Sequence, residues 1–295
     1  MDAEKIINLP RHHKKTFIAL LIALYAISLM VAHFLFEQSP QELFLDQVKS
    51  VATALITALF GLAIILTFLP TQEKGEIIEI PAQKITKEFE LLLSTANRWR
   101  YKGNFGRYLR GKVLPTLASR QNIHVIACLI DPLDEGLCTH HADYRGSINA
   151  IDKGRKYNAD SVATEVIVTV ILASWYVANR GMTIDLYFSR AFDPIRIDSN
   201  DDAMILTVED RRSPALKITK NHFTASHFEL QMQTARNQSR KVDLKGMRKG
   251  IELAEISESD VKLVMKRAEL LQLCNRLSVA AILDACKKSK NPYEN

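Results

Sequence analysis

The 295-residue sequence lacks the short motifs that identify several common classes of enzyme. It contains no G-x-x-x-x-G-K-[ST] phosphate loop, no G-x-G-x-x-G dinucleotide fingerprint, no G-x-S-x-G nucleophile elbow and no H-E-x-x-H zinc motif. It also has no internal repeat and no low-complexity tract. These absences argue against the corresponding hydrolases and oxidoreductases, and we expect a protein without catalytic activity, metal or cofactor.

Cysteine is scarce, and the four present show no tight, even spacing: Cys128, Cys138, Cys274 and Cys286. Such thiols stay free in a reducing compartment, although four cysteines could also form two bridges. His140 and His141 follow Cys138 closely, but no second Cys/His pair stands at zinc spacing. The sequence therefore predicts no metal site.

Charge is absent from two long stretches near the N-terminus, residues 16–36 and 50–69. A helix needs about 20 apolar residues to cross the hydrocarbon core, so each stretch is long enough to span it once. A cleaved signal peptide is the main alternative, but its apolar region is shorter and ends at a small-residue site. We therefore expect two transmembrane helices.

The flanking charges predict the orientation of this hairpin. The tail 1–15 carries Lys5, Arg11, Lys14 and Lys15, whereas the connecting loop 37–49 has one cation against three acids. Cytoplasmic flanks are enriched in Lys and Arg. The prediction is a bacterial inner-membrane protein with a cytoplasmic tail, a periplasmic loop and a cytoplasmic domain over 70–295.

The two predicted spans also lack what a transporter needs, because they have no paired carboxylates, no central charges and no proline-broken interior. The second span instead presents small residues at three- and four-residue spacing: Ser50, Ala54, Ala58 and Gly61. Small residues allow close helix approach. This face either packs against the first span or drives homo-oligomerisation.

The remaining sequence, 70–295, carries the net charge of +6, since cations and anions balance before it. Apolar runs predict strands over 76–81, 123–130, 182–188, 194–198, 203–210 and 215–220. Periodic segments predict helices over 86–96, 105–117, 160–179, 222–240 and 258–288, the last one long helix or a helical pair. Interleaved strands and helices indicate an α/β or α+β domain. Residues 160–179 are nearly as apolar as a span, but Glu165 favours a buried central helix.

The densest chemical signal is the segment 98–112, RWRYKGNFGRYLRGK. Cations neutralise phosphates and aromatic faces stack on bases, so this segment is predicted to contact a nucleic acid or nucleotide. The alternative is a solvated helix face whose cations lie near anionic lipid. The candidate contacts are Arg98, Trp99, Arg100, Tyr101, Lys102, Arg107, Arg110 and Lys112.

A second candidate site is Asp131, at the carboxyl end of the predicted strand 123–130, together with His140. Open α/β sheets place ligands at such strand ends. The alternative function is therefore a membrane-anchored enzyme that acts on lipid or nucleotide there. An aspartate before Pro132 is also typical of a turn or a helix cap.

The strand–helix organisation, with a basic aromatic segment before the first long strand, resembles the phospholipase D-type domain. That family needs H-x-K-x-x-x-x-D, and none of the histidines in 70–295 begins this motif. The resemblance implies a degenerate phospholipase D-like fold that has lost its catalytic pair.

The whole arrangement resembles the two-transmembrane effectors of bacterial anti-phage systems, on the spans 16–36 and 50–69 and the basic segment 98–112. Both retron-associated and cyclic-nucleotide-signalling systems contain such effectors, and we favour the retron type. The resemblance implies abortive infection, in which the effector damages the inner membrane or arrests growth. Its cytoplasmic domain would be restrained by a reverse transcriptase–DNA complex or controlled by a cyclic nucleotide.

Overall fold

The computed structural model describes Ile27, Met30 and residues 40–68, 75–150, 154 and 156–289. The chain divides into two compact units, 1–72 and 73–295. The first predicted span, 16–36, lies outside the described residues apart from Ile27 and Met30. Residues 50–68 of the second predicted span lie in helix α3 (Pro40–Phe68), which also takes in the predicted connecting loop 37–49 from Pro40 onward, and Leu69 lies outside the described residues.

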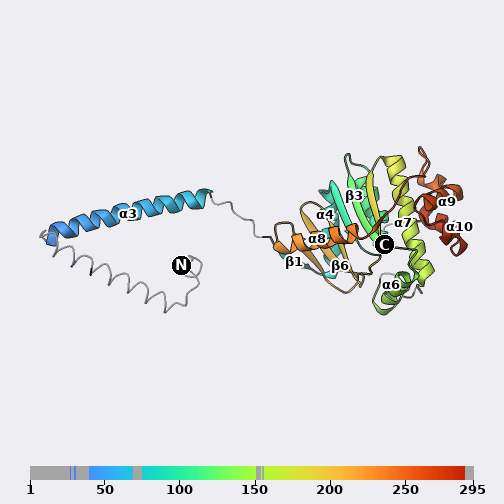
Figure 1. Ribbon diagram of the computed structural model, residues 1–295, viewed down its shortest axis with the longest axis horizontal. Helices are drawn as coiled ribbons and strands as arrows, with labels where there is room; N and C mark the ends of the chain where they lie inside the picture. The colour runs from blue at the N-terminus through green and yellow to red at the C-terminus, as the bar shows by residue number, and fades with distance from the viewer. Residues whose placement is uncertain are drawn as a thin grey trace. The chain divides into compact units, whose positions relative to one another are not determined.

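Within unit 73–295, eight described strands form one mixed sheet in the order β1-β7-β6-β5-β2-β3-β4-β8 (Figure 1). Its centre is parallel, because β2 pairs with β3 and β3 with β4 in the same direction, and the other pairs are antiparallel. The strands are β1 (Ile77–Ile80), β2 (Arg98–Lys102), β3 (His124–Ile130), β4 (Thr183–Ser189), β5 (Ile195–Ser199), β6 (Ala203–Val208), β7 (Ala215–Thr219) and β8 (Arg240–Lys241).

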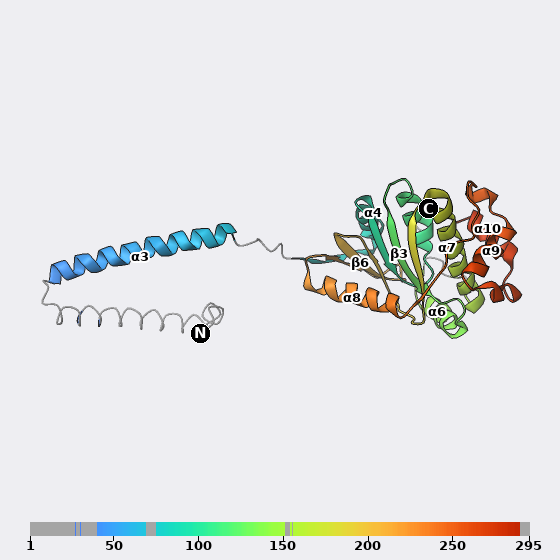
Figure 2. The same ribbon diagram turned by 45° about the horizontal axis from the view of Figure 1, so that its top comes forward.

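The helices divide between the two faces of this sheet (Figure 2). Alternate residues of β6 show the division, because Ile205 belongs to the main core and Met204 to a smaller core beneath α8 (Phe223–Asn237). The main core is completed by α4 (Ile85–Ser94), η2 (Leu109–Val113), α5 (Leu114–Leu117), α6 (Glu135–Ser147), α7 (Ala159–Arg180), η3 (Leu253–Glu255), α9 (Glu258–Arg267), η4 (Leu271–Asn275) and α10 (Val279–Lys287). The short turn η1 (Ala82–Lys84) leads into α4 and has no buried residue.

Helix α7 is the centre of the main core and contacts α6, α9 and α10. It begins at a capping box in which the Asn158 and Ser161 side chains each accept from the other's backbone N–H. It ends at Gly181, whose φ of 65° gives the left-handed turn that helix ends favour. By length and composition α7 could cross a membrane, but 78% of the apolar 18-residue stretch that meets this test is buried inside the fold. The structure therefore supports a buried central helix.

Most predicted elements are present, and the domain is a mixed α/β domain as expected. The strands β2 and β8, the helix α6 and the short helical turns η1 and η3 were not predicted from the sequence. The predicted helix over 105–117 contains the π-helical turn η2, which continues into α5, and α5 carries Pro115 in its first turn. Proline lacks an N–H, and a first turn needs none there. Residues 258–288 form a helical pair joined by η4.

The core role of α7 predicts a large stability cost for truncating its buried face. We expect Ile171→Ala to lower the free energy of unfolding by about 2–5 kcal/mol, because Ile171 is fully buried. Leu91→Ala is the control, since Leu91 is 50% exposed on α4, and it should cost under about 1 kcal/mol. Denaturant unfolding of the detergent-solubilised chain would be followed by fluorescence of Trp99 and Trp175. If Ile171→Ala and Leu91→Ala lower the free energy of unfolding equally, α7 is not a buried core helix.

Candidate functional site: an arginine-lined pocket

A pocket of about 760 Å³ opens at the carboxyl end of β2. Its walls come from segments far apart in the chain: the η1–α4 corner, the loop after β2, α6, β5 and the end of β6. Four arginines line it, each from a different one of these segments: Arg107, Arg145, Arg196 and Arg211. Carboxyl ends of parallel strands are where α/β sheets place ligands, so this pocket is the candidate site.

The loop after β2 enters the pocket through Gly106, which has a φ of 71°. A Cβ atom there would lie 3.1 Å from Thr169 Cγ2 and 3.2 Å from Leu129 Cδ2, both of them core side chains. Glycine is the residue that accepts both the left-handed backbone and the close approach. It lets the loop pass tightly against α7 and β3, with Phe105, Arg107 and Tyr108 on the pocket wall.

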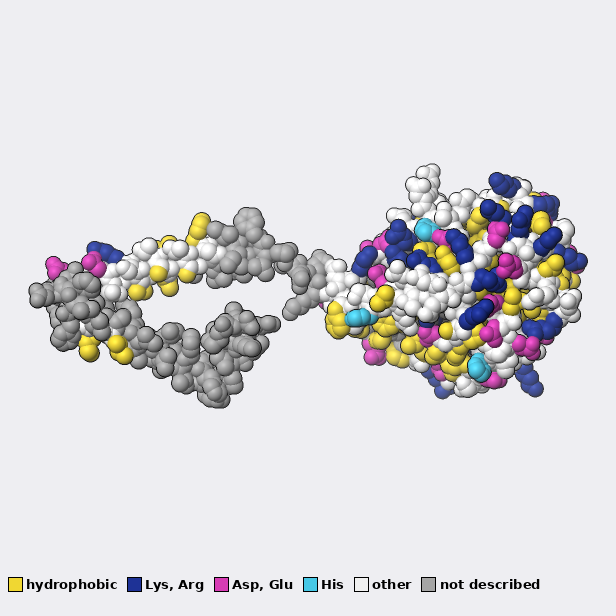
Figure 3. Space-filling view, viewed as in Figure 1, with side chains coloured by type: hydrophobic (Ala, Val, Ile, Leu, Met, Phe, Trp, Pro, Cys, Tyr) yellow, Lys and Arg dark blue, Asp and Glu magenta, His cyan; other side chains and the backbone are white. Residues whose placement is uncertain are grey.

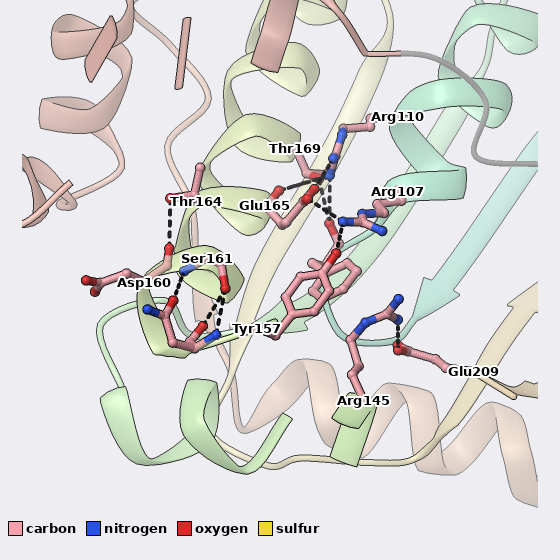
Figure 4. Close-up of polar contacts among 12 residues, drawn as sticks. Arg107, Arg110, Arg145, Tyr157, Asp160, Ser161, Thr164, Glu165, Thr169 and Glu209 are labelled. Atoms are coloured by element: carbon pink, nitrogen blue, oxygen red, sulfur yellow. Dashed lines mark hydrogen bonds and ion pairs between the residues drawn. The ribbon is translucent and has the colours of Figure 1, made fainter. Parts of the chain in front are cut away.

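Glu165 of α7 fastens this loop (Figure 4). Its carboxylate accepts hydrogen bonds from both Arg107 and Arg110, and Arg110 also donates to Thr169 Oγ1 at 2.8 Å and to the Glu165 carbonyl at 3.0 Å. We call Glu165, Arg107, Arg110 and Thr169 the Glu165 cluster. Burial opposes the charged carboxylate, but the hydrogen bonds and charges of both arginines outweigh it and lower the Glu165 pKa to about 2.

A second buried acid, Glu209, lies after β6 and holds the opposite wall. Its oxygens accept from Arg145, from Asn104 Nδ2 at 2.9 Å and from His141 Nε2 at 3.2 Å. Burial again opposes ionisation, and the His141 and Arg145 contacts prevail, so the Glu209 pKa falls to about 2. Because Glu165 and Glu209 both stay ionised near neutral pH, neither is poised as a general acid.

Aromatic rings surround the pocket arginines in two groups. The Arg107 and Arg145 guanidinium carbons lie 5.0 and 5.1 Å from the Phe105 ring centre, and both also lie over Tyr157. The Arg196 guanidinium carbon lies within 5.5 Å of three ring centres, those of Phe89, Tyr101 and Tyr108. Cation–π contacts orient the guanidinium groups without neutralising them.

The predicted contact segment, 98–112, divides between strand and pocket. Trp99 is fully buried, so its ring is not available for stacking, and Tyr101 is buried apart from its place on the pocket wall. Arg98 and Arg100 pair with Asp201, Lys102 with Asp193, and Lys112 with Glu90. Arg110 is buried in the Glu165 cluster. Of the predicted contacts, Tyr101 and Arg107 line the pocket.

No pattern in the sequence predicted the pocket residues outside this segment. Arg145 and Glu209 are separated by 64 residues and meet through the packing of α6 against the sheet. The sequence around Arg196, Ile195-Arg196-Ile197, shows only the alternation of apolar and polar residues of an ordinary strand. A polar residue inside an otherwise apolar strand end is the one local sign that could have drawn attention to it.

The two residues of the alternative site, Asp131 and His140, lie in different surroundings. Asp131 is buried and accepts from the Leu133 backbone N–H at 3.0 Å, as a turn residue does. His140 is exposed on α6. Cys138 precedes His140 by two residues, and burial raises its pKa to about 12, which makes it a poor nucleophile. Among the residues that the structure describes, no three His, Cys, Asp or Glu side chains form a metal-ligand group.

The helix-packing candidates lie together on α3. At 100° per residue, Ser50, Ala54, Ala58 and Gly61 fall within about 80° of arc. Ser50, Ala54 and Ala58 are exposed in the structure. A Cβ atom added at Gly61 would meet no described atom within 4 Å, so a larger residue is accommodated there.

The Glu165 cluster predicts a large effect for removing one charge. Glu165→Gln leaves two buried guanidinium groups facing a neutral amide, and we expect the free energy of unfolding to fall by about 3–5 kcal/mol. Glu90→Gln is the matched control, because Glu90 pairs with Lys112 at 3.5 Å on the exposed side of α4. That change should cost less than about 1 kcal/mol. If Glu165→Gln lowers the free energy of unfolding no more than Glu90→Gln does, the Glu165 cluster does not stabilise the fold.

The same two acids predict an acid limit for stability. Their folded pKa values of about 2 lie below the ordinary 4.5, so their contribution is fully present above pH 4.5 and is lost as the pH falls toward 2. Denaturant midpoints of the wild-type chain, measured between pH 6 and 2.5, should fall across this window. Glu165→Gln should show a shallower fall, and an identical pH profile would contradict the assignment.

No known family model matches the chain, and no curated protein matches it. Among solved structures, it is similar to Nuc, a phospholipase D family member from Salmonella typhimurium, with 14% identity and a TM-score of 0.34 over 57% of this chain and 98% of that one. It is also similar to TrmBL2, an archaeal chromatin protein, with 13% identity and a TM-score of 0.34 over 68% of this chain and 67% of that one. Both are distant likenesses.

Proposed function

We propose that this protein is a membrane effector of a bacterial anti-phage system, of the retron-associated type. In this proposal, residues 16–36 and 50–69 cross the inner membrane and unit 73–295 is cytoplasmic. A reverse transcriptase–DNA complex keeps the effector inactive. Infection releases that restraint, and the effector then permeabilises the membrane and arrests growth.

The observation that carries the proposal is the apolar surface of α3. Hydrophobic side chains, drawn in yellow, are exposed along the described part of α3 (Figure 3). They include Leu55, Ile56 and Phe60, and the last is 69% exposed. Water-exposed apolar patches of this kind mark contact with lipid or with protein. Residues 50–68 of the helix contain no charge, and their length suits one crossing of the hydrocarbon core. A bilayer is therefore the proposed environment.

The character of unit 73–295 supports a regulatory rather than a catalytic role. Its pocket gathers four arginines, and the two buried acids that fasten the pocket walls are held ionised. Such a site can bind an anion, and an acid that stays ionised at neutral pH cannot serve as a general acid there. We also propose that the domain is a phospholipase D-like fold without the catalytic pair, in line with the missing H-x-K-x-x-x-x-D motif.

The proposed mechanism is a two-state equilibrium of the whole chain. One state is stabilised by the partner on the cytoplasmic domain, and loss of the partner shifts the population to the other. In the second state, helices from several copies associate through Ser50, Ala54, Ala58 and Gly61, because small residues permit close backbone contact within lipid. The active species is then a homo-oligomer.

Leucine substitutions on this face of small residues test whether helix association through it causes depolarisation. Ala54→Leu or Gly61→Leu should abolish depolarisation and killing on expression without the restraining partner, while membrane insertion persists. Membrane potential would be read with a voltage-sensitive dye, and insertion by fractionation. Ala52→Leu is the matched control, since it lies about 160° round the helix from Ala54 and should keep toxicity.

The dye assay also tests the proposal as a whole. Expression alone should depolarise cells, and co-expression with the neighbouring genes should suppress it. If the wild-type chain never depolarises cells or slows growth under any condition of release, the effector function is excluded. If Ala54→Leu and Gly61→Leu both stay toxic, helix association through the small face is excluded.

A further inference from the structure

We propose that helix α8 rests on the membrane surface and inserts the side chains of Phe223 and Leu230 among the lipids. We call the exposed side chains of α8, between Phe223 and Asn237, the α8 face. The inference rests on the proposed function for the presence of a bilayer. It deepens that function by giving unit 73–295 a lipid contact of its own.

The α8 face contains no Lys, Arg, Asp or Glu. The two charged residues of the helix, Glu229 and Arg236, are partly buried, and its exposed residues are Phe, Ser, His, Leu, Gln, Thr or Asn. Helix α9 shows the ordinary pattern of a surface helix, because its Lys262, Lys266 and Arg267 are all exposed. Removing a charge from water is costly, so a face without charges is the easier one to cover.

Two large apolar side chains of the α8 face project directly away from the core. Ala225 and Met232 pack against the sheet in the smaller core. At 100° per residue, Phe223 and Leu230 lie about 160° and 140° round the helix from Ala225. They are 72% and 60% exposed. Exposed apolar side chains that share one face mark contact with lipid or with protein.

The exposed apolar surface continues from α8 onto the neighbouring strands. Ile218 of β7 belongs to the core beneath α8, and Ile77 of β1 lies directly opposite it in the sheet. Leu216 lies two residues from Ile218, so all three side chains project to the α8 side of the sheet. Ile77 and Leu216 are nearly half exposed. The apolar surface therefore extends from α8 to the edge strand β1.

The chain enters unit 73–295 beside the start of α8. A Cβ atom on Gly75 would overlap the backbone of His222, so Gly75 packs against the residue that precedes Phe223. Phe68, the last residue of α3, and Gly75 are seven positions apart. An extended chain advances at most about 3.6 Å per residue, so Gly75 lies within about 25 Å of a membrane surface at which α3 ends.

The far edge of the sheet differs from this end in position and in charge. β1 and β8 are the two edge strands, and seven spacings of about 4.8 Å put them roughly 34 Å apart. The charged helix α9 ends at the β8 edge, where Arg240 Nη1 donates to the Ala268 carbonyl at 3.1 Å (Figure 1). The uncharged apolar face thus lies at the end that the chain enters, and this match selects the bilayer as its occupant.

The composition of the α8 face also selects the kind of lipid contact. Helices that bind anionic membranes carry Lys and Arg beside their apolar face. The α8 face has neither, so burial of apolar area is the driving force for its contact. We expect the contact with zwitterionic phosphatidylcholine, without strengthening by anionic lipid.

The test places the full chain in phosphatidylcholine vesicles whose acyl chains carry bromine, which quenches tryptophan on contact. Phe223→Trp reports from the α8 face, and Leu263→Trp is the matched control, at an exposed leucine of α9. Trp99 and Trp175 are buried and give both variants the same background. Bromine should quench the added tryptophan at 223 several-fold more strongly than the one at 263. Equal quenching at both positions would overturn the proposal.

A second substitution tests whether the apolar stripe causes the contact. In the Phe223→Trp chain, Leu230→Gln should weaken the quenching, whereas Leu271→Gln, at an exposed leucine of η4, should leave it unchanged. Thermal unfolding checks that these variants fold, and surface changes of this kind alter stability little. An emission from position 223 that is shifted to the blue but not quenched by bromine would mean that protein, such as a second copy, covers the face. That result would also overturn the proposal.

Phe60→Trp on α3 separates this inference from the proposed function. If bromine quenches the tryptophan at 60 but not the one at 223, α3 lies in the bilayer and the α8 contact is excluded. If the tryptophan at 60 is not quenched, the proposed membrane effector is excluded, and the α8 contact stands or falls with the quenching at 223 alone.

Discussion

The buried carboxylate of Glu165 is the constraint on which the candidate site depends. A charge inside an apolar helix is costly unless it is paired and hydrogen-bonded. Glu165 is 8% exposed, yet two arginines from the loop after β2 hold it ionised. The pairing is mutual, because burial lowers the Arg110 pKa while Glu165 raises it. This cluster thus joins the loop to α7, which the apolar core already holds, and orients Arg107 on the pocket wall.

The rest of the pocket repeats this arrangement around the sheet edge. Glu209 pairs with Arg145 of α6, as Glu165 pairs with Arg107 of the loop, and Asp198 pairs with Arg196 of β5. Each arginine is therefore placed by an acid that lies behind it. A buried pair contributes little net stability when compared with apolar packing of the same volume. The effect of three such pairs around one cavity is therefore to orient its arginines more than to stabilise the fold.

The sequence predicted the scaffold better than the site, for a physical reason. Strand β3 and helix α7 are apolar runs whose length decides their structure. Strand β2 was missed because Arg98-Trp99-Arg100-Tyr101 alternates aromatic and basic residues, a pattern that suits either a ligand surface or a half-buried strand. The structure gives the strand, with Trp99 and Tyr101 inward. Arg145, Arg196 and Glu209 are brought together by tertiary folding alone, and no local pattern could have joined them.

Chain connectivity suggests how an occupied pocket could reach the N-terminal unit. The pocket wall at Ala82, Gln83, Ile85 and Thr86 follows β1 directly, and β1 is the first element of unit 73–295 after the N-terminal unit. β1 is an edge strand with a single neighbour, β7, and four paired residues. Short edge strands are among the elements that open most readily. A ligand can shift an equilibrium only by its different affinity for the two states. Contact with residues 82–86 would supply that difference if the two states differ in the pairing of β1, and the signal would then pass along the backbone.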